Sequence, residues 1–283
     1  MTYLYGRPVQ EQILTGLHNE WATSAITPHL RVLMVGDNRA SESYIAHKRH
    51  VIQNLGGELS VTRFSEQDDE KEVIETIKAY NTDTNIDGIL LQLPVPSAYN
   101  TSTLLNTIST DKDVDGLAAG NLGRLFYAEN HSQFKPATVQ AVLELLAYYQ
   151  VSLKSRHVVL VGAGLLVNQP LYHILIARGA SVTTVHQDTP DIKPFTQHGD
   201  LLITATGQAG LITADHIKEG ATVIDVGFSH DSHGRVVGDV DAEEVRSKAG
   251  ALSPVPGGVG PVTVACLAHN VFRAAKLNSL PNS

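Results

Sequence analysis

The sequence predicts an α/β protein with two domains built on parallel β-sheets. Short apolar runs alternate with helical patterns along the chain, which is typical of βα units. The length of 283 residues exceeds one typical hydrophobic core and favours two domains of roughly 100–150 residues each. A stretch poor in apolar residues, at 121–135, separates two series of elements. We therefore expect the domain boundary at about 120–140.

In the first series, apolar runs predict strands and stretches of helical pattern predict the helices between them. The expected strands are 30–35, 58–64 and 88–93, and the expected helices are 41–55, 69–80 and 100–107. Residues 111–116 are rich in charge and predict a loop.

The second series begins after Pro136 and repeats the alternation. The expected helices are 138–149 and 168–178, and the expected strands are 157–161, 181–186, 201–204, 222–226 and 251–252. A last helix is expected at about 262–275. Because it follows the second series, this helix is free to return to the first domain and make that domain discontinuous.

Composition and charge exclude several classes of protein. The 21 Lys and Arg against 29 Asp and Glu give a net charge of −8 without a basic block, which argues against binding to duplex nucleic acid or an anionic membrane. Neither a signal peptide nor an apolar run long enough to span a membrane is present. The single cysteine, Cys266, and 13 histidines without paired ligand spacing predict neither a disulfide nor a metal site. We expect a cytoplasmic protein.

Residues 254–263, with the sequence Pro-Val-Pro-Gly-Gly-Val-Gly-Pro-Val-Thr, predict an irregular loop. Proline fixes φ and glycine permits positive φ, so no ordinary element is expected here. The loop should lead into a helix that starts near Thr263, where backbone N–H groups bind flat or anionic ligands. The alternative is a plain connection between two elements.

The turn Gly162-Ala163-Gly164 follows a buried strand and opens a helix, which is the context of a Rossmann-type dinucleotide-binding turn. Val167 replaces the third glycine of the usual pattern, so a mere tight turn is the alternative. The next strand ends about 20 residues on at Gln187 and Asp188, where a carboxylate can bind ribose hydroxyls. That second feature favours nucleotide binding.

Three further segments carry candidate chemistry in the first domain. Tyr44 and Lys48 lie four residues apart, on one face of the expected helix, and the lysine is either a solvated side chain or a proton shuttle. Gln92 ends an apolar strand and should face the ligand crevice. In Lys112-Asp-Val-Asp-Gly116, a buried aspartate can accept the paired N–H donors of a guanidine-like heterocycle, unless the segment is an exposed turn.

Taken together, these segments resemble the bifunctional methylenetetrahydrofolate dehydrogenase/methenyltetrahydrofolate cyclohydrolase family. The likeness covers most of the chain, from about Val35 to the last helix. It rests on Tyr44-x-x-x-Lys48 and on residues 87–94, 112–116, 121–125, 223–227, 238–241 and 254–263.

The resemblance implies two α/β domains that flank a cleft, in a homodimer. The first domain, 1–135 completed by about 262–283, would bind folate, and the Rossmann-type domain, 136–261, would bind NADP or NAD. The family oxidises 5,10-methylenetetrahydrofolate to the methenyl cation and hydrolyses that cation to 10-formyltetrahydrofolate. Two alternatives remain, an NAD-linked dehydrogenase without hydrolysis and a folate-binding protein that has lost cofactor use.

The resemblance also implies roles for individual residues. Lys48 would catalyse the hydrolytic step with Gln92 as its partner, Tyr44 would stack near the aminobenzoyl ring, and Asp115 would anchor the pterin. A cationic substrate disfavours the ammonium form of a lysine, which agrees with a neutral amine acting as base. The expected folate-contacting loop residues are Pro256, Gly257 and Gly258, and the expected cofactor-contacting residues are Gly162, Ala163, Gly164, Gln187, Asp188 and Phe228.

The chain departs from the family pattern at the turn that would bind the cofactor. The family commonly has Gly-Arg-Ser where this chain has Gly162-Ala163-Gly164, and a serine where it has Gln187. Loss of a charge-assisted contact to the 2′-phosphate of NADP costs about 1.5–3 kcal/mol, and Asp188 adds repulsion. We therefore predict a weakened or reversed NADP preference, unless Lys154, Arg156 or Arg178 supplies the missing charge. A further departure, Ala137 and Val139 in place of Cys and Pro, has no clear consequence.

Overall fold

A computed structural model describes residues 1–24, 26–127 and 134–279, and the chain divides into two compact units. One unit comprises Met1–Glu11 and Thr138–Thr263, and the other comprises Gln12–Ala137 and Val264–Ser283. We name them after their main sheets, the six-stranded unit and the three-stranded unit. The first eleven residues belong to the six-stranded unit, whereas the sequence analysis placed them in the other domain.

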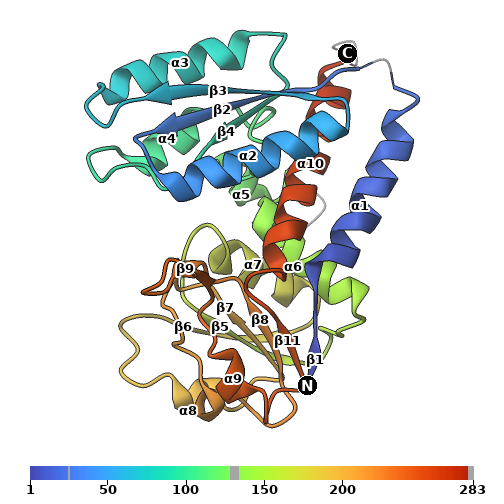
Figure 1. Cartoon of the computed structure of the whole chain (residues 1–283), viewed down its shortest axis with the longest axis vertical. Coiled ribbons are helices and arrows are strands. Elements are labelled where there is room, and N and C mark those ends of the chain that lie inside the picture. The colour runs from blue at the N-terminus through green and yellow to red at the C-terminus, as the bar shows by residue number, and fades with distance from the viewer. Residues whose placement is uncertain (25, 128–133, 280–283) are drawn as a thin grey trace. The chain divides into compact units, whose positions relative to one another are not determined.

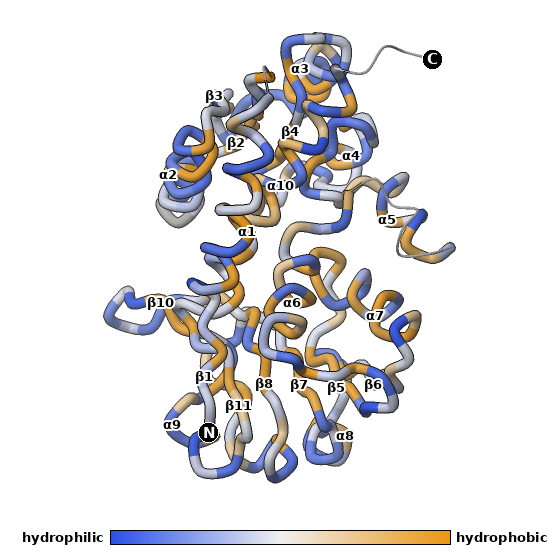
Figure 2. The backbone as a smooth tube through the Cα atoms, turned by 90° about the vertical axis from the view of Figure 1, so that its right-hand side faces the viewer, coloured by the Kyte–Doolittle hydropathy of each residue, from blue (hydrophilic) through white to orange (hydrophobic). Residues whose placement is uncertain are grey.

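The three-stranded unit is built on a parallel sheet with the order β3-β2-β4. Its strands are β2 (His29–Val35), β3 (Glu58–Phe64) and β4 (Gly88–Leu91), and its helices include α2 (Arg39–Asn54), α3 (Glu70–Thr82), α4 (Thr101–Thr107) and α5 (Ala119–Tyr127). Leu33 and Leu91 on one face of the sheet pack against Ile77 of α3 and Leu104 of α4. Figure 1 shows α2 and α3 running alongside this sheet. In Figure 2, hydrophilic and hydrophobic residues alternate along the turns of α2, as expected for a helix half covered by the unit's core.

The six-stranded unit contains a parallel sheet with the order β1-β11-β8-β7-β5-β6. Its strands are β1 (Thr2–Tyr3), β5 (His157–Val161), β6 (Ser181–Val185), β7 (Leu201–Thr204), β8 (Thr222–Asp225) and β11 (Ala251–Ser253). Its shorter elements are α7 (Asn168–Ala177), α8 (Lys193–Thr196), η1 (Ala214–His216), α9 (Ala242–Val245) and the antiparallel pair β9 (Ser229–His230) and β10 (Val236–Val237).

The strand order reverses around β5, because β6 lies on one side of it and β7 on the other. Such a reversal leaves a crevice at the carboxyl ends of the two strands, where ligands bind in open α/β sheets. The predicted α/β class and the Rossmann-type arrangement of this sheet are confirmed. β1 extends the sheet by pairing with β11, which explains why the first residues group with this unit.

Three helices contain residues of both units, namely α1 (Gly6–Trp21), α6 (Ala137–Tyr148) and α10 (Val259–Asn278). Sequence patterns predicted neither α1 nor α5, and α5 overlaps the stretch at 121–135 where a domain boundary was expected. Asn121 and Leu125 of α5 are buried, so tertiary contacts stabilise a helix that the composition did not indicate. Within the described ranges, we find no helix with the length and hydropathy that a bilayer crossing requires.

The last helix begins at Val259, so the prediction that 254–263 forms no ordinary element and that the helix starts near Thr263 was wrong. Pro261 lies in the first helical turn, where backbone N–H groups have no partner within the helix and proline is tolerated. Thr263 already lies one turn inside, and its hydroxyl donates to the Val259 carbonyl at 3.2 Å. The irregular part of this segment ends at Gly258.

Candidate active site

A buried lysine and a buried glutamine are hydrogen-bonded in the three-stranded unit. Lys48 lies on α2 and Gln92 directly follows β4; their exposed fractions are 8% and 9%. The Lys48 Nζ donates to the Gln92 Oε1 at 2.9 Å. The Gln92 Nε2 donates to the Leu93 carbonyl at 2.7 Å, which orients the amide so that its oxygen faces the amine. The amine is therefore held in place by a neutral partner.

Local structure explains how these two side chains meet. The Asn38 side chain accepts a hydrogen bond from the Ser41 N–H at 3.0 Å and caps α2, which sets the phase of the helix. The expected strand 88–93 ends earlier, at Leu91, although the Gln92 N–H still donates to the Leu33 carbonyl at 2.8 Å. Gln92 thus keeps its place in the sheet ladder while its side chain leaves the strand at the carboxyl edge.

Asp115 is held next to this pair by a loop that extends the sheet. The Ile89 N–H donates to the Lys112 carbonyl at 2.7 Å, and Ile89 pairs with Asp113 in a parallel bridge. The buried Asp113 carboxylate accepts hydrogen bonds from the Ala118 N–H at 2.8 Å and from the Asn121 amide at 2.9 Å. Together these contacts fix the backbone around Asp115, so the segment is not the exposed turn that was one alternative.

The other side of the same loop is held by α10. The Asn270 amide donates to the Val114 carbonyl at 2.8 Å and to the Lys135 carbonyl at 3.1 Å. At Gly116 φ is +70°, and a Cβ there would lie 2.6 Å from the Lys135 carbonyl carbon, so only glycine fits. Sequence reasoning missed Asn270. A polar residue in the middle of an apolar helical pattern is the signal that indicates it.

Burial and charge act in opposite directions on the two ionisable groups. Burial lowers the pKa of Lys48, and the nearby Asp115 carboxylate opposes this change. Burial raises the pKa of Asp115, opposed by Lys48 and by the Ala137 N–H. A lysine whose pKa is lowered by burial is able to act as a base, provided that a substrate reaches its amine.

Tyr44 lies one turn before Lys48 on α2, and residues four apart share one face of a helix. Its ring is partly buried, and burial raises the pKa of its phenol, so it remains protonated at neutral pH. The structure therefore brings together Lys48, Gln92 and Asp115, with Tyr44 on the lysine face of the helix.

In the six-stranded unit, the turn after β5 is tight. At Gly162 φ is +99°, and a Cβ there would lie 2.7 Å from the Ala205 carbonyl oxygen. Asn168, the first residue of α7, donates from its side-chain amide to the carbonyls of Val161 and Gly162, both at 2.9 Å. Sequence reasoning also missed this buried asparagine. A polar residue at the start of the helix after a glycine turn is the signal that indicates it.

A cavity of about 720 Å³ opens at the carboxyl ends of β5, β6 and β7. Five of the six predicted cofactor residues line it: Gly162, Ala163, Gly164, Gln187 and Asp188. Phe228, the sixth, is not among its lining residues; it follows β8, is 39% exposed and packs edge-on against His230. The remaining lining residues are Val161, His186, Thr189, Pro190, Asp191, Ile192, Ala205, Thr206, Gln208, Leu211 and His216.

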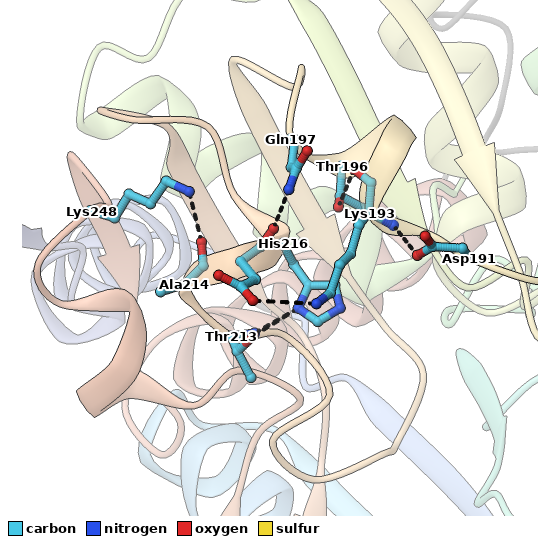
Figure 3. A network of polar contacts seen from close by, with 9 residues as sticks. Asp191, Lys193, Thr196, Gln197, Thr213, Ala214, His216 and Lys248 are labelled. Carbon is cyan, nitrogen blue, oxygen red and sulfur yellow. Dashed lines mark hydrogen bonds and ion pairs between the residues drawn. The ribbon is translucent and has the colours of Figure 1, made fainter.

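The ionisable side chains of this cavity are acidic or histidine. The His186 Nδ1 lies 3.4 Å from an oxygen of Asp188. Asp191 and His216 also line the cavity, and both belong to the polar network of Figure 3. Neither lysine nor arginine lines the cavity within the part of the chain that the structure describes. The predicted substitutes Lys154, Arg156 and Arg178 are therefore not placed to replace an arginine at position 163.

The loop before α10 belongs to the six-stranded unit, as do Pro256, Gly257 and Gly258 within it. At Gly257 φ is +105°, and its carbonyl accepts a hydrogen bond from the Gly6 N–H at 2.8 Å. A Cβ on Gly6 would overlap the Gly258 carbonyl, so the loop packs directly on the start of α1. Lys48, Gln92 and Asp115 belong to the three-stranded unit.

Comparison with known proteins decides the family. Residues 4–115 match the catalytic domain of tetrahydrofolate dehydrogenase/cyclohydrolase, and residues 136–279 match the NAD(P)-binding domain of the same family. Over 279 residues the chain is 41% identical to the bifunctional protein FolD of Nautilia profundicola, which covers 98% of each chain. The chain belongs to the tetrahydrofolate dehydrogenase/cyclohydrolase family. The resemblance seen in the sequence is thereby confirmed.

Solved structures of this family agree with the comparison of sequences. The bifunctional enzyme FolD from Campylobacter jejuni is 36% identical, with a TM-score of 0.93 over 98% of this chain and 99% of that chain. The dehydrogenase-cyclohydrolase from Trypanosoma brucei, solved with NADP and an inhibitor, is 32% identical, with a TM-score of 0.92 over 98% of both chains. All residues that line the 720 Å³ cavity lie within the range that matches the family's NAD(P)-binding domain.

Proposed function

We propose that this chain is a bifunctional folate enzyme. It oxidises 5,10-methylenetetrahydrofolate to the 5,10-methenyl cation and hydrolyses that cation to 10-formyltetrahydrofolate. The observation that carries the proposal is the buried Lys48 amine, bonded to Gln92 and close to Asp115, in a chain of this family. When bound, the nicotinamide cofactor accepts the hydride that leaves the methylene carbon. The cavity beside Gly162 has the small residues that a dinucleotide pyrophosphate requires.

In the hydrolytic step, Lys48 accepts a proton from the water that attacks the methenyl carbon. The water oxygen forms a bond to that carbon and gives a neutral hydroxyl adduct. The bond from the carbon to N5 then breaks, N5 takes up one proton, and the hydroxyl loses its proton to leave the formyl C=O, so that one of the two water protons ends on N5 and the other is released to solvent. A cationic substrate beside Lys48 disfavours the ammonium form and so adds to the effect of burial. Gln92 keeps the amine aimed at the reacting carbon through its hydrogen bond of 2.9 Å.

Asp115 binds the pterin, whose guanidine-like edge presents paired N–H donors to a carboxylate. In the free protein this carboxylate raises the pKa of Lys48. Hydrogen bonds from the pterin stabilise the charge of the Asp115 carboxylate, so the carboxylate favours the ammonium form of Lys48 less once substrate is bound. Substrate binding thus favours the neutral amine that the hydrolytic step needs, while Tyr44 stacks near the aminobenzoyl ring.

The cofactor proposal follows from the charges of the cavity. A 2′-phosphate carries about −1.5 to −2 charges, and the lining residues include Asp188 and Asp191 but no lysine or arginine in the described parts of the chain. A carboxylate at the end of β6 accepts hydrogen bonds from free ribose hydroxyls instead. We therefore infer that this enzyme uses NAD at least as well as NADP.

An absorbance assay tests the proposed function. Formation of methenyltetrahydrofolate is followed with NAD and NADP side by side, and its decay is followed separately without cofactor. Formation and decay together support the bifunctional enzyme, and formation without accelerated decay indicates a monofunctional dehydrogenase. A protein that binds folate but accelerates neither the formation nor the decay of methenyltetrahydrofolate is a binding protein, and this result would refute the proposal.

We propose two further properties, the first from the family resemblance and the second from the composition of the chain. We expect a homodimer, which sedimentation of the purified chain tests directly. We also expect the enzyme to work in the cytoplasm, where the single buried cysteine, Cys266, stays reduced.

A further inference from the structure

The wall of the cofactor cavity formed by η1 carries one side chain with an unusual hydrogen-bonding arrangement. His216 ends this short helix and lines the cavity together with Leu211, Pro190 and Ile192. Figure 3 shows its ring beside Thr213 and Lys193, with Gln197 and Lys248 bonded to the surrounding backbone. His216 was not among the cofactor residues expected from the sequence.

Contacts with Thr213 fix which nitrogen of the His216 ring carries the proton. The Thr213 backbone N–H donates to the His216 Nδ1 at 3.2 Å, and the Thr213 hydroxyl lies 2.9 Å from the same atom. A backbone N–H is only a donor, so Nδ1 is the acceptor and the neutral ring has its hydrogen on Nε2. The imidazole is held in one orientation and presents a single N–H donor away from Thr213.

The surroundings keep this ring neutral. Protonation of Nδ1 would oppose two donors, Nδ1–H and the Thr213 N–H, across 3.2 Å. Burial lowers the pKa of His216, and the Lys193 ammonium lowers it further, opposed by three carboxylates. These are Asp215, Asp191 and Glu244. At neutral pH the donor is therefore a fixed, uncharged Nε2–H.

The order of the lining residues indicates which part of a dinucleotide would reach this wall. The pyrophosphate belongs at the Gly162 turn before α7, and the ribose belongs at the end of β6 beside Asp188. Beyond the ribose, the apolar side chains of Pro190, Ile192 and Leu211 offer a surface for a flat base. The edge of the base opposite its glycosidic bond then points toward η1.

We propose that His216 recognises the adenine base of the cofactor, with its Nε2–H donating to the ring nitrogen N1. The inference rests on the proposed function, because it takes a nicotinamide adenine dinucleotide as the ligand of this cavity. It goes further in assigning base selectivity to one atom. Adenine N1 is an acceptor, whereas hypoxanthine carries a hydrogen on N1 and sets two donors against each other. A site built on a fixed donor rejects such an analogue.

Equilibrium binding tests the assignment without relying on turnover. Isothermal titration calorimetry with NAD and with nicotinamide hypoxanthine dinucleotide gives the ratio of the two dissociation constants. His216→Asn is the informative variant, because the Asn Oδ1 takes the place of Nδ1 toward Thr213 while the Nε2 donor is lost. His216→Gln is its counterpart, because the Gln amide reaches the position of Nε2. His198→Asn is the matched control, since His198 is exposed and does not line the cavity.

The wild type should bind NAD roughly three- to tenfold more tightly than the hypoxanthine analogue, as expected for one hydrogen bond. His216→Asn should weaken the binding of NAD by a similar factor and bind the two dinucleotides equally. His216→Gln should retain part of the preference for NAD. His198→Asn should bind both dinucleotides as the wild type does. Equal binding of the two dinucleotides by the wild type, or full discrimination in His216→Asn, overturns the inference. NAD binding that depends on His216 in a chain without dehydrogenase activity would instead refute the proposed function and support this assignment.

Discussion

Restoring an arginine at position 163 should restore the use of NADP. Ala163 lines the cavity between Gly162 and Gly164, and the described residues that line this cavity include neither lysine nor arginine. A charge-assisted bond from a guanidinium to the phosphate contributes about 1.5–3 kcal/mol. This energy corresponds to roughly a ten- to 150-fold gain in kcat/KM for NADP in Ala163→Arg. Replacement of Asp188 by serine should add less, under about 1 kcal/mol, because 78% of its side chain is exposed and solvent screens its charge.

The measurement is kcat/KM with NAD and with NADP for the wild type, Ala163→Arg, Asp188→Ser and the double variant. Ala163→Leu is the control, because it adds bulk at the same position without charge. It should not raise kcat/KM for NADP. The values for NAD should change little in Asp188→Ser, apart from the loss of one ribose hydrogen bond. A wild type that already prefers NADP by tenfold or more, about 1.4 kcal/mol, would refute the reasoning.

Three other predictions concern the buried ionisable groups. Lys48→Met should lower the rate of methenyltetrahydrofolate hydrolysis by about 10²–10⁴-fold, while circular dichroism shows an intact fold; hydrolysis at the wild-type rate would contradict the role of the amine. Asp115→Ala should raise the folate KM in both reactions and leave the dissociation constant of NAD unchanged. Loss of NAD binding alone would show that Asp115 does not belong to the folate site. Burial raises the pKa of Asp225 to about 7. Between about pH 4 and pH 7 the folded state therefore holds a proton that the unfolded state has released, so this group makes the stability of the fold decrease as the pH rises through that range. The melting temperature of Asp225→Asn relative to the wild type should therefore rise between pH 5 and pH 8, and a constant or falling difference would show that Asp225 is ionised throughout.

Sequence patterns predicted most of the secondary structure because these segments carry their own signals. β3 has the expected bounds, and α2, α3 and α4 start within two residues of the expected positions, each after an asparagine or aspartate cap. The two long helices that the sequence patterns did not predict are α1 and α5. Asn121 and Leu125 of α5 are buried, so packing against other segments helps to hold a helix that its own sequence does not indicate. The early start of α10 was missed because Gly260 and Pro261 indicate a loop unless they fall in the first helical turn.

The sequence by itself determined the α/β class, the family and most candidate residues, because parallel strands bring their carboxyl ends to one edge and each strand there ends in a recognisable motif. Only the tertiary structure decided how those residues are held. Asn270 supports the loop of Asp115 from 156 positions away, and Gln92 meets Lys48 across 44 positions. The neutrality of the His216 ring and the absence of lysine and arginine among the described lining residues of the cavity also depend on packing. Periodicity reports which side of an element is buried, whereas hydrogen-bond partners, desolvation and the charge of a cavity depend on distances between segments, which no local pattern encodes.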